Sequence, residues 1–286
     1  MPKHSPAPFY RRRATIAAAA LGVTATLGAG VLMSNAFAGG NATSAVKKVK
    51  LPPVNAAFDY QIGGAYTPPK GVRVVSRDRA AKPAKGLYNI CYVNAFQAQP
   101  DALGWWNRNH PDLVLRDRAK RAVIDEDWGE ALLDTSTAAK RAKLASVVGG
   151  WFTGCAKKGF QAVEPDNLDS YERSGGRLSK ADNTAFAALL ARRAHAAGLA
   201  IAQKNAAELL GSHAKTGFDF AIAEECGEYD ECGGYAKTYA RRVFDIEYTT
   251  SGFRSACSAW GKKLSVVKRD EDVQPRGASG YVYRSC

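Results

Sequence analysis

The amino-acid sequence predicts an α/β fold, a single-domain (β/α)8 TIM barrel. Eight short runs rich in β-branched and aromatic residues alternate with stretches of helical periodicity, the order expected of parallel strands joined by right-handed crossovers. The chain that follows an N-terminal targeting segment has the length of one such barrel. It contains no internal repeat and no second composition regime, so we assign it to one domain.

The targeting segment, residues 1–38, has the pattern of a secretory signal peptide. Basic residues at Lys3 and 11–13 precede an apolar run over 14–32, and the small-residue site Ala36-Phe37-Ala38 follows it. The run is rich in Ala, Gly and Thr rather than Leu, which favours cleavage over an uncleaved membrane anchor. We therefore expect a secreted, extracellular protein without stable membrane insertion after signal cleavage.

A linker and then the barrel domain are expected after the signal. Residues 39–53, rich in Gly, Ser, Lys and Pro, predict a mobile linker, and residues 54–286 form the predicted (β/α)8 domain. Because parallel strands leave a barrel at the same end, the loops that follow them should share one face. The eight predicted strands are Ala57–Ile62, Val72–Val75, Leu87–Asn94, Phe160–Glu164, Leu199–Lys204, Phe218–Ala223, Val243–Tyr248 and Leu264–Lys268.

Two helices are marked by their own residues. One has the ends of a typical helix, because Ser179 and Asp182 have the spacing of a capping box and Gly198 stands where a left-handed C-cap is expected. The other has apolar residues at helical spacing, so that one face can pack on a sheet. These residues are Leu144, Val147, Val148, Trp151 and Phe152.

One long connection, residues 95–130, follows the third predicted strand and carries Trp105, Trp106 and Trp128. A loop of this length tends to be functional, and its place after a strand puts it on the C-terminal face of the barrel, where active sites lie. Exposed indoles there could stack on sugar rings. Alternatively, the tryptophans anchor the loop on the barrel, because large aromatic side chains dominate packing anywhere.

The cysteine pattern predicts disulfides and no metal. All six cysteines lie beyond the predicted signal, and an even number in an oxidising compartment argues for pairing. No CxxC pair is present and the four histidines show no ligand spacing, so we expect no metal and no cofactor. The spacing suggests Cys226 with Cys232 and Cys257 with Cys286, whereas Cys91 and Cys155 either pair or remain buried thiols.

The formal net charge of +13 raises the question of a nucleic-acid partner. The Lys and Arg residues are scattered and form no stripe, which argues against nucleic-acid binding. A steep dependence of affinity on salt would be the sign of such a partner. We expect none, and we expect a monomer.

Acidic residues gather at two predicted strand exits. Glu164-Pro165-Asp166-Asn167 ends the fourth strand, where Pro165 lacks the amide that would continue the ladder. Glycoside cleavage needs two such groups, because one carboxyl protonates the leaving oxygen while another attacks or stabilises the oxocarbenium-like carbon. The alternative is that these acids only solvate loops or cap helices. The second acidic group, after the sixth strand, is Glu224, Glu225, Glu228, Asp230 and Glu231.

Polar residues at the other strand exits complete a ring. The fifth strand ends in Lys204-Asn205, where Lys204 could hold a carboxylate ionised and Asn205 could bond a sugar hydroxyl. Glu247 and Tyr248 stand at the seventh exit, and Lys268 and Asp270 stand at the eighth. No GxSxG elbow is present and no Cys stands beside a His in a known motif, which argues against serine or cysteine hydrolases.

In this order the segments resemble the family 114 glycoside hydrolases, the endo-alpha-1,4-polygalactosaminidases. The strongest elements are the EPDN segment and the FDFA…E…C…YDEC segment, which are specific when they occur together. Phe58 and Tyr60 stand where relatives tend to carry tryptophan, and Ala223 where Asn is common, which bears on substrate identity. The likeness covers almost all of the chain beyond the signal, over Phe58–Ile62, Ile90–Tyr92, Leu133-Asp134, Gly159–Tyr171, Lys204-Asn205, Phe218–Cys232, Glu247-Tyr248 and Lys268.

The resemblance implies an enzyme that cuts alpha-1,4-linked galactosamine polymers internally. Asp166 is the implied nucleophile or charge stabiliser, with Glu164 as its competitor, and Glu224 is the implied general acid/base. Carboxyls roughly 5 Å apart would give retention of configuration. The alternatives are a catalytically inactive carbohydrate-binding barrel and a hydrolase of a different exopolysaccharide. Residues expected to bind the substrate, an amino-sugar polymer, are Glu164, Asn167, Lys204, Asn205, Tyr92, Asp59, Glu247 and Lys268.

Overall fold

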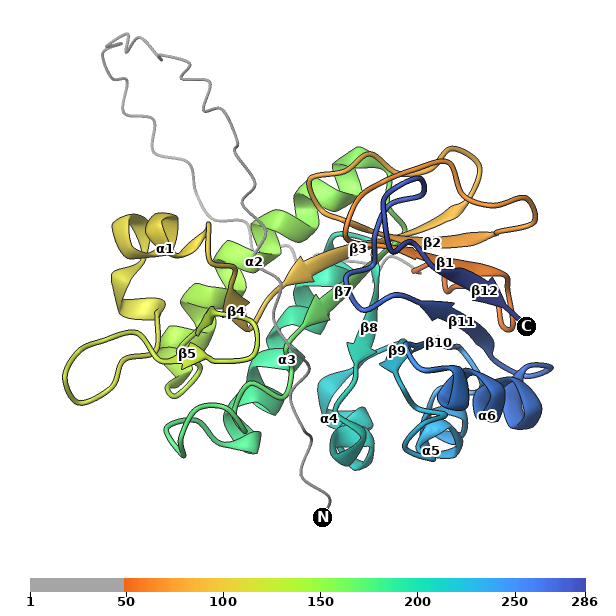
Figure 1. Cartoon of the computed structure of the whole chain (residues 1–286). Coiled ribbons are helices and arrows are strands. Elements are labelled where there is room, and N and C mark those ends of the chain that lie inside the picture. The colour runs from red at the N-terminus through yellow and green to blue at the C-terminus, as the bar shows by residue number, and fades with distance from the viewer. Residues whose placement is uncertain (1–48) are drawn as a thin grey trace, which may run out of the picture. The chain divides into compact units, whose positions relative to one another are not determined.

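The computed structural model describes residues 49–286, which belong to one compact unit (Figure 1). The predicted signal peptide and the predicted linker up to residue 48 lie outside the described residues. The rest of that linker lies against the barrel, because Val49 packs on its inner core and the carbonyl of Lys50 accepts a hydrogen bond from the Tyr88 hydroxyl at 2.6 Å. Among residues 49–286, no helix combines the length and the apolar character that a membrane span requires.

The central sheet has the predicted strands in the predicted order. Each strand pairs in parallel with the next, and each overlaps one predicted run. β12 (Tyr283–Ser285) adds an antiparallel edge to the last of them. The two ends of the sheet approach each other, since the amide of Ala56 donates to Ser265 Oγ at 3.0 Å, and the barrel is nearly closed. The strands are β1 (Phe58–Gln61), β2 (Val74–Asp78), β3 (Tyr88–Asn94), β7 (Ala162–Asp166), β8 (Ala200–Lys204), β9 (Phe220–Glu224), β10 (Val243–Glu247) and β11 (Ser265–Arg269).

The core has two parts, one on each face of this sheet. Inside the barrel, residues at alternate strand positions such as Phe58, Ile90 and Phe244 pack together. The intervening positions, such as Val163 and Ile201, pack outward against the helices. Because side chains alternate along a strand, this packing fixes which residues at the strand ends point into the barrel mouth.

The helices follow the strands from β3 to β10. Both predicted helices are present, and the capping box of Ser179 and Asp182 and the left-handed Gly198 are confirmed. The α-helices are α1 (Leu103–Asn109), α2 (Ala138–Lys158), α3 (Lys180–Ala196), α4 (His213–Thr216), α5 (Cys232–Thr238) and α6 (Thr250–Trp260), with 3-10 turns η1 (Pro111–Leu113) and η2 (Ala207–Ser212).

Three of the expected helices are missing from the described residues. β11 is followed by turns and β12 rather than by a helix, and the β1–β2 connection, 62–73, and the β2–β3 connection, 79–87, contain none. Prolines in both connections oppose helix formation. Arg77 instead links these loops to the outside of the barrel, because its guanidinium donates to the Gln61 side chain and to the carbonyls of Tyr66 and Lys82. The eight-strand prediction is therefore confirmed, while regular strand–helix alternation fails on this side.

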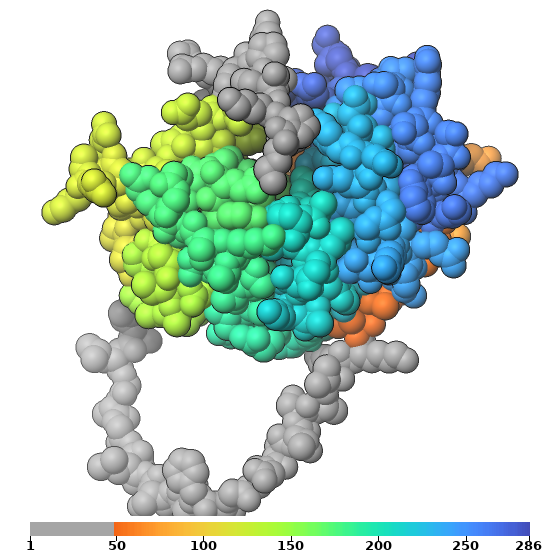
Figure 2. Space-filling model, turned by 90° about the horizontal axis from the view of Figure 1, so that it is seen from below, coloured from red at the N-terminus to blue at the C-terminus, as the bar shows by residue number. Residues whose placement is uncertain are grey.

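The long tryptophan-bearing connection forms a small antiparallel sheet of its own, in the order β4 (Gln97–Ala98), β6 (Glu130–Leu132), β5 (Ile124–Asp125). Figure 2 shows this insertion, in yellow and yellow-green, on the opposite side of the folded unit from the blue C-terminal residues. Trp106 is buried and packs near Trp151, whereas Trp128 is 67% exposed. Trp106 therefore anchors the insertion on the barrel, whereas Trp128 is exposed, as stacking on a sugar ring would require.

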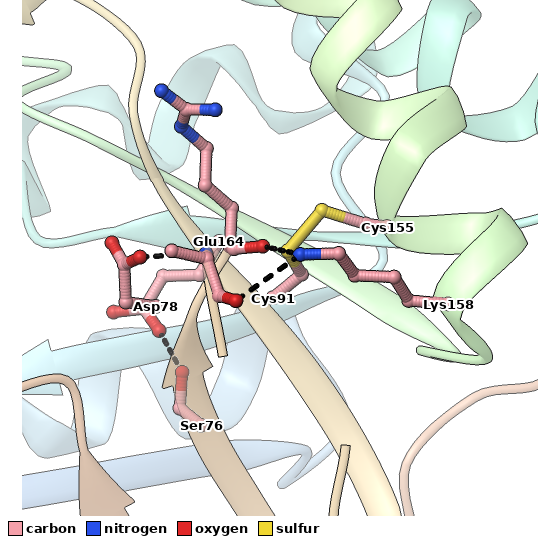
Figure 3. Close-up of a disulfide and its surroundings, with 8 residues drawn as sticks. Ser76, Asp78, Cys91, Cys155, Lys158 and Glu164 are labelled. Carbon is pink, nitrogen blue, oxygen red and sulfur yellow. Dashed lines mark hydrogen bonds between the residues drawn. A yellow bond between two sulfur atoms is a disulfide. The ribbon is translucent and has the colours of Figure 1, made fainter. Parts of the chain in front are cut away.

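Three disulfides connect the elements. Both suggested pairs are present, and Cys91 also pairs with Cys155, which attaches β3 to α2 (Figure 3). Beside this bond the Lys158 ammonium donates to the carbonyls of Arg79 and Ala80. The second disulfide, Cys226–Cys232, closes the loop that follows β9.

Candidate active site

The barrel mouth is lined by the last inward-pointing side chains of the strands. On β7 the inward positions at the end are Glu164 and Asp166, and on β8 and β9 they are Lys204 and Glu224. The parallel register aligns them, because Asn94 on β3 lies beside Asp166 and Ile246 on β10 lies beside Glu224. The two acidic groups predicted at neighbouring strand exits therefore meet at one face.

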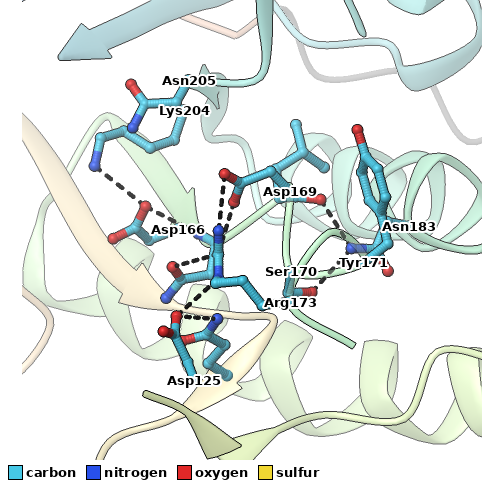
Figure 4. Close-up of polar contacts among 12 residues, drawn as sticks. Asp125, Asp166, Asp169, Ser170, Tyr171, Arg173, Asn183, Lys204 and Asn205 are labelled. Carbon is cyan, nitrogen blue, oxygen red and sulfur yellow. Dashed lines mark hydrogen bonds and ion pairs between the residues drawn. The ribbon is translucent and has the colours of Figure 1, made fainter. Parts of the chain in front are cut away.

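Lys204 is the centre of this arrangement. Its side chain is 2% exposed, and its ammonium nitrogen lies 3.1 Å from Asp166 Oδ1, 2.9 Å from Glu224 Oε2 and 3.9 Å from Glu164 Oε1. Figure 4 shows it pointing toward Asp166. Burial lowers the pKa of Lys204, but the three carboxylates outweigh burial and raise it above its ordinary value. The ammonium is therefore charged at neutral pH.

Asp166 is ionised and lies at the barrel mouth. Its side chain keeps 17% of its surface exposed. The Tyr92 hydroxyl donates to Oδ2 at 2.8 Å, and the Asn167 amide donates to Oδ1 at 2.9 Å. Burial raises the pKa of Asp166, yet the Lys204 ammonium and these two donors outweigh it and lower the pKa below its usual value.

Glu224 faces Asp166 across the Lys204 ammonium and is 23% exposed. Asn205 Nδ2 donates to Glu224 Oε2 at 2.8 Å, while Asn205 Oδ1 accepts from the Glu224 amide at 2.8 Å. The Tyr248 hydroxyl donates to Oε1. The nearest oxygens of Asp166 and Glu224 can be no further apart than the sum of their distances to the shared nitrogen, about 6 Å.

Glu164 lies beneath the other two carboxylates, fully buried. Its oxygens accept from the Tyr60 hydroxyl at 2.8 Å and from Ser76 Oγ at 2.6 Å, and Ser76 and Glu164 are drawn in Figure 3. Burial outweighs Lys204 and these donors and raises the pKa of Glu164 to about 7. Glu164 therefore forms part of the floor of the site.

A second network connects the insertion to the rim. Asn94 and Asn167 donate to Glu130 Oε2 at 2.7 and 3.2 Å. Arg173 lies between Asp125, at 2.7 Å, and Asp169, at 2.8 Å (Figure 4). Burial raises the pKa of Glu130 to about 7, and the charges of Asp166 and Asp125 contribute to the rise. The insertion thus brings a further carboxyl to the edge of the cleft.

Three of the residues expected to bind substrate do not reach the mouth. Asp59 is buried on the outer face of β1, where it accepts from Gln61 and from Tyr66. Glu247 is buried on the outer face of β10, and Lys268 on β11 donates to Thr250 of α6 at 2.6 Å. These three occupy outward strand positions. The expected residues that the structure does bring together are Asp166, Glu224, Glu164, Asn167, Lys204, Asn205 and Tyr92.

Sequence reasoning missed Tyr60, Ser76 and Glu130, and it placed Tyr248 at its strand exit without selecting it as a site residue. Tyr60, Ser76 and Tyr248 hold the acidic oxygens, and Glu130 lies at the rim. Strand alternation was the available signal for the first three, because Tyr60 follows Phe58 by two positions and Tyr248 follows Ile246 by two. Glu130 lies on a separate sheet, and no such periodicity points to it.

One group of possible metal ligands occurs among residues 49–286. It consists of Cys226, Cys232 and Asp245, whose ligand atoms lie within 4.8 Å of one another. Both sulfurs are bonded to each other in the second disulfide, so neither is a thiolate that could bind a metal.

The family model for glycoside-hydrolase family GH114 matches residues 39–286. The chain belongs to family GH114. It is therefore a glycoside hydrolase that degrades a polysaccharide, and the resemblance noted from the sequence is confirmed. No curated protein sequence matches the chain.

Solved structures show the same fold. Ega3 of Aspergillus fumigatus, crystallised in complex with galactosamine, is 23% identical with a TM-score of 0.67, over 85% of this chain and 100% of that chain. The glycoside hydrolase domain of PelA from Pseudomonas aeruginosa is 18% identical with a TM-score of 0.55, over 78% of this chain and 97% of that chain. The GH114 barrel thus has neighbours in both a fungus and a bacterium.

Proposed function

We propose that this GH114 protein is an exported endo-hydrolase that cleaves alpha-1,4-linked galactosamine-type polysaccharide with retention of configuration. The observation that carries the proposal is the pair formed by Asp166 and Glu224, which face each other across Lys204 at the barrel mouth and keep part of their surface exposed. Their separation, at most about 6 Å between nearest oxygens, agrees better with retaining enzymes than with inverting ones, which need room for a water.

Asp166 is the proposed nucleophile. The Lys204 ammonium and the Tyr92 hydroxyl keep its pKa low, so the carboxylate is ionised over the working pH range. Its oxygen attacks the anomeric carbon as the bond to the leaving oxygen breaks, which forms a glycosyl ester. Glu164 is the weaker candidate for this role, because it is fully buried and both of its oxygens accept hydrogen bonds from the barrel wall.

Glu224 is the proposed general acid/base. In its protonated form it gives a proton to the leaving oxygen, and as a carboxylate it then takes a proton from the water that hydrolyses the ester. Asn205 and Tyr248 hold both of its oxygens, so its position is fixed for the two steps. These two neighbours also select the orientation of the carboxyl plane.

An amino-sugar polymer is the proposed substrate. Loss of Lys3 and the three arginines at 11–13 with the signal lowers the formal charge from +13 to +9, and a chain of this charge repels a cationic polymer at long range. The mouth nevertheless gathers Asp166 and Glu224 around one buried ammonium, and Glu130 adds a further carboxyl at its rim. A local excess of carboxylates favours protonated amino groups at contact distance. The galactosamine complex of Ega3, which shares the fold, supports the same substrate class.

Export is supported by the N-terminal pattern and by three disulfides, which persist in oxidising surroundings. The polysaccharide is then degraded outside the cell that makes the enzyme, in its own matrix or in that of a competitor. We propose that it acts there as a monomer.

The test is release of oligosaccharides from partially deacetylated alpha-1,4-galactosamine polysaccharide, followed by mass spectrometry. Wild-type protein and Asp230→Asn, a change of an exposed acid on the same loop, should release internal fragments, and Glu224→Gln should release none. Proton NMR of the first products should show the alpha anomer. Equal binding with no release by any of the three proteins would favour the carbohydrate-binding barrel instead.

A further inference from the structure

Behind the active site, on the outer face of β10, two carboxyl groups are buried without a cation. Asp245 and Glu247 are both fully buried, and they point away from the barrel interior toward the β9–α5 loop and α6. One oxygen of each, Asp245 Oδ2 and Glu247 Oε2, accepts no hydrogen bond from an N–H or hydroxyl donor among residues 49–286. Two orphaned carboxylate oxygens side by side in the core require an explanation.

The other oxygen of each carboxyl binds the loop that follows Glu224. Asp245 Oδ1 accepts from the Cys226 amide at 3.3 Å, and Glu247 Oε1 accepts from the Gly227 amide at 2.6 Å. The preceding amide, that of Glu225, donates to the carbonyl of Ile246 at 2.8 Å. Three consecutive amides directly after Glu224 are therefore held by three consecutive residues of β10.

The loop is shaped around the Glu247 carboxylate. A Cβ added to Gly252 would lie 2.1 Å from Glu247 Oε2, and one added to Gly227 would lie 2.9 Å from Glu247 Oε1. Glu225 adopts a left-handed conformation, with φ of 60°, and the Cys226–Cys232 disulfide closes the turn. Gly252 on α6 thus leaves room for the Glu247 carboxylate, and Gly227 leaves room for both this carboxylate and Ala256 of α6.

The charges around the pair are of one sign. Glu225 and Glu228, both on the β9–α5 loop, add negative charge from the solvent side. On β11, Lys268 is the register partner of Glu247, but its ammonium donates to Thr250. The elements packed against the pair therefore supply no ammonium that could do for it what Lys204 does for Asp166 and Glu224.

We infer that Asp245 and Glu247 share one proton and act as positioning residues that hold Glu224 in place below the pH at which that proton is lost. The proton lies on Asp245 and is donated through Oδ2 to Glu247 Oε2, so both orphaned oxygens are satisfied by one bond. Above that pH two adjacent buried charges repel, and the amides of Cys226 and Gly227 are released. Glu224, two residues earlier, then loses its position.

Burial supports this assignment. It raises the pKa of Asp245 well above its ordinary value, with the charge of Glu247 and the hydrogen bond to Glu247 adding to the rise, and it also raises the pKa of Glu247. The folded protein therefore binds a proton that the unfolded chain has released, and the stability from this pair falls as pH rises. The direction is the reverse of that for Asp166, whose pKa is lowered.

Hydrogen exchange tests the inference without substrate. Between about pH 6 and about pH 10, after correction for intrinsic exchange, protection of the Cys226 and Gly227 amides in the wild type should fall by about tenfold or more. Asp245→Asn keeps the acceptor and carries a permanent donor toward Glu247, so its protection should persist across that range. In Glu247→Gln the new side-chain amide can donate to an ionised Asp245, so protection of the Cys226 and Gly227 amides should persist there too.

Activity provides the second arm, which rests on the proposed role of Glu224. The alkaline limb of kcat should move to higher pH by about one unit or more in Asp245→Asn, while Asp230→Asn, on the same loop, should match the wild type. Superimposed exchange profiles of wild type and Asp245→Asn would overturn the inference. If neither protein cleaves the polymer yet the exchange profiles differ as expected, the proposed function fails and the proton-sharing pair stands.

Discussion

Two pairs of carboxyl groups lie on opposite faces of the same sheet, and they are stabilised in different ways. Asp166 and Glu224 point into the barrel and share the ammonium of Lys204. Asp245 and Glu247 point outward, and one oxygen of each has no donor among residues 49–286. The comparison teaches that a central cation keeps the neighbouring Asp166 carboxylate ionised for chemistry, whereas without a cation the same crowding of carboxyls retains a proton.

The largest effect should come from removing either member of the inner pair. We expect Asp166→Asn and Glu224→Gln each to lower kcat about a thousandfold or more while the protein still folds. The melting temperature should fall modestly in Asp166→Asn, because this change removes the stabilisation that the lowered pKa of Asp166 reflects. Steady-state kinetics and calorimetry measure the two quantities. Retained turnover in either variant would remove that residue from the mechanism.

Removing the cation should make the inner pair resemble the outer one. Lys204→Met leaves three carboxylates without their ammonium, so we expect kcat to fall about a hundredfold and the free energy of unfolding to fall by about 3 kcal/mol or more near pH 7.

The pH dependence sharpens this comparison. The pKa of Asp166 is lower in the folded protein than in the unfolded chain. The interactions of its carboxylate therefore stabilise the wild type at pH values above the pKa of the unfolded chain, and this contribution is lost as the pH falls through the pKa of the folded protein. The stability difference between Lys204→Met and wild type should therefore shrink in acid. Lys268→Met, an outward-facing lysine on β11, is the matched control, and an equal loss there would contradict the special role of Lys204.

A smaller effect is expected from the hydroxyl that holds Glu224. Tyr248→Phe removes the donor to Oε1 and leaves Asn205 and Lys204 in place, so we expect kcat to fall about tenfold with KM nearly unchanged. Tyr229→Phe, at an exposed position on the neighbouring loop, provides the comparison. A rise in KM alone would instead assign Tyr248 to substrate binding.

The smallest effect is expected from a pair formed by a histidine and an aspartate away from the barrel mouth. His195 on α3 contacts Asp219 Oδ2 at 2.8 Å, and this hydrogen bond raises the pKa of His195. Because the pKa of His195 is higher in the folded protein, its charged pair stabilises the fold fully at pH values below the pKa of the unfolded chain. This stabilisation is lost as the pH rises through the pKa of the folded protein. His195→Gln should lower the free energy of unfolding by about 0.5 to 1 kcal/mol at pH 5 and by almost nothing at pH 8. Urea unfolding at both pH values measures it, and an equal loss at both would rule out the charged pair.

The strands and their exits could be predicted because each strand is a short apolar run that ends in polar residues. The direction of the terminal side chains was harder. Strands buried on both faces show little polar alternation, so Glu247 and Lys268 looked as suitable as Tyr248. Counting in twos from the inner-core residue Ile246 would have selected Tyr248.

The helices that were expected after β1 and β2, and that are absent there, illustrate a second limit of prediction from the sequence. Pro68, Pro69 and Pro83 were visible in the sequence, and they argue locally against helices, but the regular barrel pattern outweighed them. The pairing of Cys91 with Cys155 could not be predicted, because 64 residues separate the two and only the packing of α2 on β3 brings them together. The rim position of Glu130 likewise depends on how the insertion folds back.

The buried ammonium has a practical consequence for labelling. Amine-reactive reagents need an accessible, unprotonated amine, and Lys204 offers neither, because it is enclosed by three carboxylates that hold its proton. The exposed lysines elsewhere on the surface react first. Coupling to beads through lysines should therefore leave Lys204 and the three carboxyl groups around it unmodified.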